Sequence, residues 1–426
     1  MYIKIFLINN CPFARLKGKQ LISALRKGYV HPKTFRISKS ASLLGAEEAF
    51  VYLAKSLELK RRGVDVISFG IGQPDFQPPP HVIAEAKRAM DEGFNGYGPS
   101  LGMPELREAV AEFVSQEYDT DVKPEEVAVT VGAKSAIFMA MVTLLEPGDE
   151  VIIPDPSYPL YESVARYVGA KPVFLRLHKG NNYKVTFAEV EKLFTSKTRM
   201  IVLNYPENPV GTTIEGKDVE EIVDFASKKG VVVLSDEIYD HYAYEKKHFS
   251  TLQTPAWREC VYHVNGFSKT FGMTGWRLGY VVANADLISK LSVVANNIYS
   301  CPVTFEQIAA ARALKQGLDW FKPIFEEYKR RRDIIHSELA SIKGVRVAKP
   351  EGAFYIFPDF SQIISEKGLS GERELADRLL YEKGVVVLPG TAFPKEGGVN
   401  HLRFSYAVAE DAIREGMNRI REWIES

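Results

Sequence analysis

Cysteine is scarce in this 426-residue sequence, which contains only Cys11, Cys260 and Cys301. Their odd number, wide separation and lack of CxxC or Cys/His spacing argue against a disulfide framework and against a structural zinc site. An excess of either charge is also missing, because Lys plus Arg and Asp plus Glu both total 54. The chain therefore has no overall basic field that would attract nucleic acid. We expect a reducing, cytoplasmic environment, no metal and no nucleic-acid partner.

Long apolar segments and dinucleotide fingerprints are missing as well. Runs such as VVVL at 231–234 have the length of a strand and not that of a membrane helix. No GxGxxG follows any of the expected strands. With 46% hydrophobic and 25% charged residues, the composition is that of an ordinary globular protein large enough for two domains. We therefore expect no membrane partner.

Acidic residues are absent from residues 1–46, which carry nine Lys or Arg. The apolar stretch IFLI is too short for a secretory signal, whereas the acid-free composition with Ser and Arg fits an organelle transit peptide better. A basic tail or an over-extended gene start together outweigh targeting as explanations. Residues 1–40 are thus treated as a basic N-terminal extension whose order and origin stay open.

Strand-like and helix-like patterns alternate from about residue 127 onward. The expected strands are VAVTV, VIIP, KPVFLRL, TRMIVLN, VVVLSDEIY, CVYHVNGF and RLGYVVA, and the helices among them include GAKSAIFMAMVTLL, SYPLYESVARYVGA and KDVEEIVDFASKKG. After about residue 300 come the long charged helix DWFKPIFEEYKRRRDIIHSELASI, the strands AFYIFPDF, VVVLPG and HLRFSYAV, and the closing helix EDAIREGMNRIREWI. This order predicts an α/β layered domain followed by a smaller α+β domain.

The segment VTVGAKSAIF at 129–138 joins a strand to a helix through Gly132, Ala133 and Lys134. Small residues at such a turn let backbone N–H groups approach an anion at the positive end of the helix, which suits a phosphate. Strand-to-helix turns are often glycine-rich for steric reasons alone, so this signal is weak by itself.

A carboxylate ends the apolar strand of VVVLSDEIYDHY at 231–242. Asp236 would lie at the edge of a parallel sheet, where open α/β folds bind ligands, and could hold the protonated ring nitrogen of a pyridine cofactor. Tyr239 could donate to the phenolic oxygen beside it. Taken alone, the stretch fits a helix-capping aspartate and a packing tyrosine better.

Three other stretches carry polar groups that local structure does not explain. Asn208 follows a strand in LNYPENPVG, where turns are the ordinary explanation. Arg403 lies inside the apolar strand of HLRFSYA, so it is either solvated at an edge or reserved for an anion such as a substrate carboxylate. In NGFSKTFGMTGWRLGY, Lys269 and Arg277 stand among glycines and hydroxyls, which fits a surface turn or a covalent cofactor anchor with a phosphate-binding arginine.

Together these motifs resemble the class I/II aminotransferases, which are pyridoxal-phosphate enzymes of fold type I. The lysine motif is similar to SKTFxMTGWRLGY of a branch that includes aspartate and aromatic aminotransferases. The resemblance runs from about residue 40 to the end through GIGQPDF, YGPSLGMPELREA, EPGDEVIIPDPSYPLY, the NPxG loop, SDEIY, GAFYIFP, VLPGTAF and LRFSYA. Seven ordered motifs are very unlikely to match by chance.

The resemblance assigns a role to each candidate residue. Lys269 would bind the cofactor covalently and then act as the catalytic base, assisted by Asp236 at the ring nitrogen and by Tyr239 at the phenolate oxygen. The other implied cofactor ligands are Tyr158 stacking on the ring, Asn208 at the phenolate oxygen, and Ser268, Arg277, the amides of Ala133 and Lys134, and Tyr97 of a second subunit at the phosphate. Arg403, Asn208 and the backbone of Gly72 would bind the substrate α-carboxylate.

One position departs from the family pattern. Several relatives carry a serine three residues before the lysine, where this chain has Gly266. Ser268 or Thr270 is a candidate for the missing hydroxyl, and the choice between them stays open.

The resemblance also implies an architecture. We expect an α/β fold of type I, with a mixed, mostly parallel seven-stranded sheet between helices and a smaller α+β domain. The expected boundaries are 1–40 for the extension, 41–75 for an arm that packs on the small domain, 76–300 for the large cofactor-binding domain and 301–426 for the small domain. Because Tyr97 would act across an interface, we expect a homodimer.

The implied reaction is a ping-pong transfer of the amino group of an L-amino acid to a 2-oxo acid, with 2-oxoglutarate as the expected acceptor. Lys134 matches a lysine of aspartate-preferring members, whereas Glu47 and Glu48 would repel an acidic side chain and Phe50 would favour an apolar one if they face the site. Aspartate, aromatic and broad donor ranges therefore stay open.

Two other functions use the same motifs. A carbon–sulfur lyase or related α,β-elimination enzyme of fold type I would need the same lysine, aspartate and arginine. A transcription regulator with an aminotransferase-like domain is a remote alternative, because residues 1–40 are too short for a DNA-binding module.

Overall fold

A computed structural model describes residues 36–394 and 396–426. The chain forms two units, Met1–Leu43 and Leu44–Ser426. Of the first unit only residues 36–43 are described, with the 3-10 helix η1 (Ala41–Leu43). Most of the expected extension over 1–40, and with it the question of targeting, therefore lies outside the described residues.

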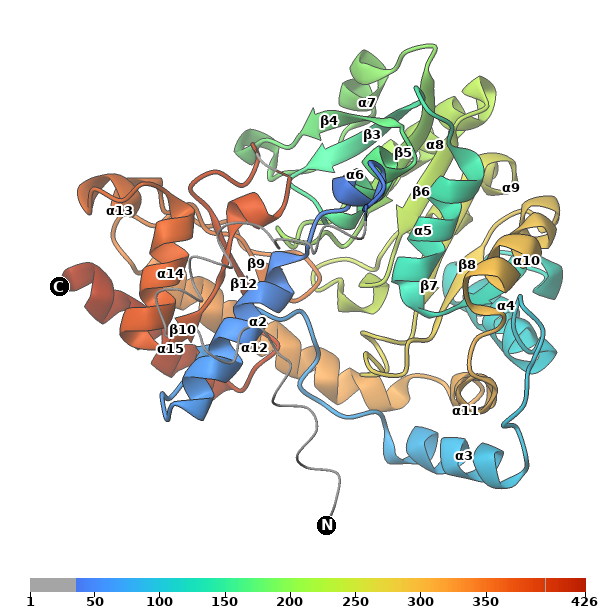
Figure 1. The fold of residues 1–426 in the computed structure, drawn as a ribbon, viewed down its shortest axis with the longest axis horizontal. Helices are drawn as coiled ribbons and strands as arrows, with labels where there is room; N and C mark the ends of the chain where they lie inside the picture. The colour runs from blue at the N-terminus through green and yellow to red at the C-terminus, as the bar shows by residue number, and fades with distance from the viewer. Residues whose placement is uncertain (1–35, 395) are drawn as a thin grey trace. The chain divides into compact units, whose positions relative to one another are not determined.

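A seven-stranded sheet is the centre of the second unit (Figure 1). Its strands are β2 (Val127–Thr130), β3 (Glu150–Asp155), β4 (Lys171–Arg176), β5 (Thr198–Asn204), β6 (Val232–Asp236), β7 (Val261–Gly266) and β8 (Gly279–Val282), in the order β2-β8-β7-β6-β5-β3-β4. All neighbours from β4 to β7 are parallel, and β8 is antiparallel to both β7 and β2. The expected mixed, mostly parallel sheet is thus confirmed.

Both faces of this sheet are buried, which explains why its strands are apolar without interruption. In β5, Ile201 and Leu203 belong to one hydrophobic core, and Met200 and Val202 belong to the other. Helix α5 (Gly132–Leu144) packs against β7 and β8, and α8 (Gly216–Lys229) packs against β6. Helix α8 stops at Gly230, whose φ of +65° suits a glycine at a helix end.

Further helices surround the sheet. They are α3 (Pro80–Asp91), α4 (Pro104–Tyr118), α6 (Leu160–Tyr167), α7 (Phe187–Leu193), α9 (Trp257–Cys260), α10 (Ala285–Tyr299) and α11 (Thr304–Leu314). Short 3-10 turns connect the elements at η2 (Pro124–Glu126), η3 (Lys179–Asn181), η4 (Asp240–Tyr242), η5 (Thr251–Gln253), η6 (Asp319–Phe321) and η7 (Gly390–Ala392). Helix α11 packs on α3 and α4.

Two small sheets lie outside the main one. The first pairs β1 (Ile67–Ser68) with β10 (Val385–Val386) in parallel, and the second has the antiparallel order β11 (Leu388–Pro389), β12 (Leu402–Ser405), β9 (Tyr355–Ile356). The accompanying helices are α2 (Glu48–Arg61), α12 (Lys322–Ala340), α13 (Ser361–Glu366), α14 (Glu372–Lys383) and α15 (Glu410–Glu425). Strand β1 therefore joins the ends of the chain, and the domain boundaries at 75 and 300 stay a prediction.

The expected strand over AFYIFPDF is longer than the one observed, which covers only Tyr355–Ile356. Ala353 has a φ of +54°, which ends extended structure on one side, and Pro358 has no N–H for a ladder on the other. No helix within residues 36–394 and 396–426 combines the length and the apolar character needed to cross a bilayer.

Candidate active site

The parallel strands bring three candidate loops to one edge of the sheet. Asn204 at the end of β5 is paired with Asp236 at the end of β6, and β7 ends beside them at Gly266. The segments after these strands carry Asn208, Tyr239 and Lys269. The carboxyl edge of such a sheet is where α/β folds bind ligands, so the predicted cluster follows from the topology.

Lys269 is half-buried, and its Nζ donates to the carbonyl oxygen of Gly72 at 2.7 Å. Burial, reinforced by the positive charges of Arg403 and Arg277, lowers the pKa of Lys269 to about 8, although Asp236 opposes the shift. An amine with this pKa is partly unprotonated near neutral pH, which suits a nucleophile or a base.

Asp236 is buried, and its Oδ2 accepts a hydrogen bond from Tyr161 Oη at 2.7 Å. Burial raises the pKa of Asp236 to about 6, while the hydrogen bonds from Tyr161 and from the amide of Ile238 act in the opposite direction. A buried carboxylate without a cationic partner in hydrogen-bond contact is ready to receive a cation such as a protonated ring nitrogen.

Tyr239 meets a residue from the C-terminal third of the chain. Its Oη lies 2.6 Å from Tyr355 Oη, and both side chains are buried. Tyr355 also explains the glycine at position 72, because a Cβ on Gly72 would lie 1.9 Å from Tyr355 Oη. Position 72 thus has to be glycine for its carbonyl to reach Lys269.

Arg403 is buried on β12 with only 4% of its surface exposed. Its Nη1 donates to Asn208 Oδ1 at 3.1 Å, its Nη2 donates to the carbonyl of Gly70, and its guanidinium stacks 4.4 Å above the Tyr355 ring. Within the described residues it forms no ion pair, and its buried Nε has no hydrogen-bond partner. A buried guanidinium with a free N–H is suited to a carboxylate from outside the chain.

The first turn of α5 is built around the arginine of the lysine motif. Gly132 has a φ of +74°, and a Cβ there would lie 2.5 Å from Arg277 Nη2. A Cβ on Gly279 of β8 would lie 2.7 Å from the Ala133 amide nitrogen. Arg277, exposed and with a φ of +56°, is therefore held against the N-terminus of α5 by two glycines. Helix N–H groups and a guanidinium together make an anion site.

The departure at Gly266 has a steric cause. Gly266 pairs with Gly279 across β7 and β8, and a Cβ on Gly266 would lie 2.8 Å from Gly279 Cα and 2.9 Å from the Leu278 carbonyl oxygen. A serine side chain does not fit there without a backbone shift. Ser268 and Thr270 are both buried, so the choice of hydroxyl stays open.

Tyr158 and Lys134 meet at Glu47, which sequence reasoning treated only as a repulsive charge. Tyr158 Oη donates to Glu47 Oε1 at 2.8 Å, and Lys134 Nζ forms an ion pair with the same oxygen. Glu48 instead pairs with Arg373 at 2.7 Å. Tyr97 is the predicted site residue that the described chain does not bring to this cluster by any contact, since it is 95% exposed.

Tyr161 and Tyr355 were missed as site residues. Both stand inside motifs that carry the resemblance, PSYPLY and GAFYIFP, but a tyrosine in an apolar segment is ordinarily a packing residue. Their roles depend on contacts with Asp236 and Tyr239, which lie 75 and 116 residues away in sequence. The only available signal was their position inside motifs.

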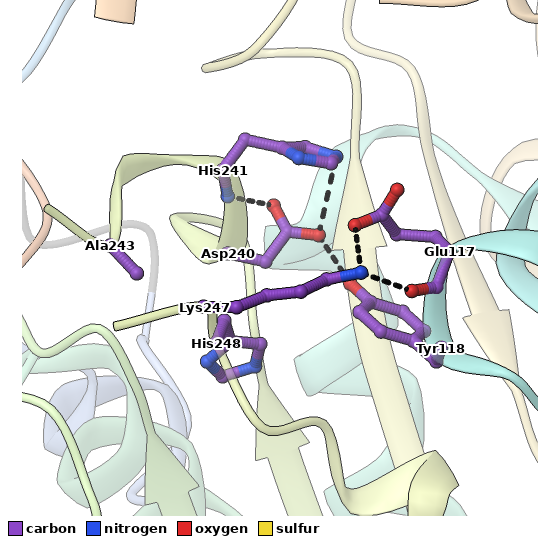
Figure 2. A pocket seen from close by; sticks show the side chains of 7 residues that line it. All are labelled: Glu117, Tyr118, Asp240, His241, Ala243, Lys247 and His248. Carbon is purple, nitrogen blue, oxygen red and sulfur yellow. Dashed lines mark hydrogen bonds and ion pairs between the residues drawn. The ribbon is translucent and has the colours of Figure 1, made fainter. Parts of the chain in front are cut away.

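A separate small pocket contains none of the predicted site residues (Figure 2). Asp240 accepts from Tyr118 and from Asn265, and Lys247 donates to the Glu117 carbonyl at 2.8 Å and pairs with its carboxylate at 3.1 Å. Its polar groups therefore satisfy one another. The full lining is Glu117, Tyr118, Asp240, His241, Ala243, Lys247 and His248. Across the described chain, no group of three or more His, Cys, Asp or Glu is arranged to hold a metal ion.

Comparison with known proteins agrees with this geometry. The family described as Aminotransferase class I and II matches residues 64–420. An aspartate aminotransferase of Sulfolobus acidocaldarius is 42% identical over 91% of this chain and 97% of its own length. Among solved structures, an aspartate aminotransferase from Thermus thermophilus with maleate has a TM-score of 0.86 at 35% identity, covering 91% of this chain and 100% of that one. An aromatic aminotransferase from Pyrococcus horikoshii has a TM-score of 0.80 at 39% identity, covering 88% and 98%.

The fold and the site thus define an enzyme of the fold type I transferases. The chain belongs to the aminotransferase class I and II family. It is an aminotransferase.

Proposed function

We propose that this enzyme uses pyridoxal 5′-phosphate to move the amino group of an L-amino acid to a 2-oxo acid, with 2-oxoglutarate as the acceptor. The donor range comprises aspartate, aromatic amino acids or both, since relatives named for each are similar at comparable identity. The observation that carries the proposal is the convergence of the half-buried Lys269, the buried Asp236 and the unpartnered guanidinium of Arg403 at one sheet edge.

The residues present fit the cofactor. When bound, pyridoxal phosphate supplies a carbonyl carbon that exchanges amino groups and an electron sink for the bonds of the α-carbon. Lys269 would hold it covalently, and Asp236, Tyr239 and Asn208 would hold the ring, with Tyr158 stacked on it. Arg277, Ser268 and the first amides of α5 would hold the phosphate in the glycine-lined cradle.

The chain's own groups then account for the proton transfer. Once the donor amine has displaced Lys269, its Nζ takes the proton from the donor α-carbon, which a pKa of about 8 allows near neutral pH. Arg403 and Asn208 orient the donor through its α-carboxylate, together with the backbone at Gly72. Because Arg403 binds a group that all amino acids share, the same site serves donor and acceptor in turn.

We include a cytoplasmic homodimer in the proposal, in which Tyr97 of one subunit reaches the phosphate of the other. Tyr97 is 95% exposed, and a group of apolar side chains on α5 and α10 is exposed as well. Val142, Val293 and Ile298 are 40%, 65% and 45% exposed, and the two helices contact each other. Sedimentation of the holoenzyme tests the dimer, and a monomer with full activity would contradict it.

The experiment that tests the function is a visible absorption spectrum of the purified protein. Aspartate, aromatic amino acids, alanine and lysine are added singly, without any oxo acid. A cofactor band that bleaches with one donor class is the expected result, and it identifies that class. A protein that stays colourless after pyridoxal phosphate is supplied would contradict the proposal.

The variant Lys269→Ala should abolish transamination while leaving the cofactor weakly bound or present as the free aldehyde. Full turnover in this variant would refute the role of Lys269. Release of ammonia and pyruvate from cysteine without an oxo acid would instead indicate an elimination enzyme.

A further inference from the structure

Glu47, the residue just before α2, is the hub of a small charged cluster at the edge of the site. One carboxylate oxygen, Oε1, accepts from Tyr158 Oη at 2.8 Å and pairs with Lys134 Nζ. Lys134 lies 5.9 Å from the ring centroids of both Tyr158 and Phe50. Its side chain is 44% exposed, against 21% for Glu47, so the cation can be reached by a ligand while the carboxylate is largely enclosed.

The charge of Glu47 reaches the groups that would bind the substrate. It raises the pKa of Lys269 and opposes the lowering of the pKa of Arg403 by burial. It also adds to the rise in the pKa of Tyr158, although burial is the main cause there. Glu47 therefore faces the same volume as Lys269 and Arg403, and Lys134 brings a second cation to that volume.

Glu48 provides a comparison one residue away. It pairs with Arg373 at 2.7 Å, and its side chain has a similar exposure of 26%. No contact joins Glu48 to Lys134 or Tyr158 within the described chain. Two adjacent glutamates thus form ion pairs of similar exposure, and only one of them touches the candidate site.

We propose that Glu47 is an internal carboxylate that competes with the second carboxylate of dicarboxylic substrates for Lys134, and so sets the preference between dicarboxylic and aromatic donors. The proposal rests on the proposed function, because it assigns selectivity within the same site. A dicarboxylate bound through Arg403 has to displace Glu47 before its other end can reach Lys134. An aromatic side chain leaves the Glu47–Lys134 pair intact.

The size of the effect follows from the exposure of the pair. Glu47→Gln keeps the side-chain length and an oxygen that accepts from Tyr158, but it removes the competing charge. Partly exposed ion pairs change an equilibrium by up to about fivefold, so dicarboxylate binding should tighten by roughly that factor. Binding of a monocarboxylate should not change.

The test compares the holoenzyme with its Glu47→Gln and Glu48→Gln variants. Calorimetry gives dissociation constants for maleate, a dicarboxylate, and for 3-phenylpropionate, a monocarboxylate, and initial rates give kcat/KM for aspartate and phenylalanine. In Glu47→Gln, maleate should bind about fivefold more tightly, and the aspartate-to-phenylalanine ratio should rise by a similar factor. In Glu48→Gln both ratios should match the wild type. Lys134→Gln, in which maleate alone should bind more weakly, serves as a second variant if Glu47→Gln does not fold.

Equal changes for both ligand classes in Glu47→Gln would overturn the proposal, because they indicate a structural latch between α2 and α5. A maleate affinity that does not change would overturn it too, as would identical shifts in Glu48→Gln. Wild-type protein that transaminates no donor would refute the proposed function instead. The ratio of maleate to phenylpropionate binding would still report on Glu47 in that case.

Discussion

The glycine at the start of α5 offers a sharp test of the predicted phosphate site. In Gly132→Ala, the new Cβ would lie 2.5 Å from Arg277 Nη2 and 3.0 Å from its Cζ, so the guanidinium has to move. A charge-assisted hydrogen bond contributes about 1.5–3 kcal/mol, and 1.4 kcal/mol corresponds to a factor of ten. Binding of pyridoxal phosphate should therefore weaken by about 10- to 150-fold.

Gly230→Ala is the matched control for this change. Gly230 has a φ of +65°, close to the +74° of Gly132, but a Cβ there meets no atom within 4 Å. An L-residue in this region costs about 1–2 kcal/mol, so both variants should lose that much in the free energy of unfolding. Urea denaturation of the cofactor-free proteins measures this loss, and fluorescence titration measures cofactor affinity. Equal cofactor affinities in the two variants would refute the phosphate role of Arg277.

Three further predictions concern the reacting groups. Because the pKa of Lys269 is about 8, its unprotonated fraction grows with pH, so covalent capture of pyridoxal phosphate by the cofactor-free protein should accelerate about tenfold from pH 6 to 7 and level off above 8; a flat stopped-flow profile would contradict this. Tyr161→Phe removes a hydrogen bond that lowers the pKa of Asp236, so the acid limb of the kcat profile should move to higher pH, and an unmoved limb would leave Tyr161 a packing residue. Arg403→Ala should lower kcat/KM for aspartate and phenylalanine alike by about 10- to 150-fold, whereas a loss with one donor only would put Arg403 at the side-chain pocket.

Most of the sheet could be predicted from local pattern. The run TRMIVLN corresponds to β5 from Thr198 to Asn204, because a strand buried on both faces is apolar throughout and a polar residue marks its end. The helix over GAKSAIFMAMVTLL likewise begins at Gly132. The strands near the C-terminus are shorter than their apolar segments, since Pro358 and the left-handed Ala353 interrupt them.

The candidate site was predictable where motifs carry it, and not where pairing across the fold decides. Lys269 and Asp236 stand out because a lysine among glycines and a carboxylate after an apolar strand are unusual. The partner of Lys134 is 87 residues away, and nothing local distinguishes Glu47 from Glu48. Two adjacent glutamates at the start of a helix look alike until the chain is folded.

The contact between Arg403 and Gly70 also has a consequence for synthesis of the chain. These residues are 333 positions apart, and β1 beside Gly70 pairs with β10 from the same distant region. At about 5–20 residues per second, about 15 s to a minute pass between their emergence from the ribosome. The sheet that carries Lys269 and Asp236 is complete by residue 282, well before Arg403 is made. A nascent chain can therefore assemble the lysine end of the site first and acquire its carboxylate-binding arginine only near the end of translation.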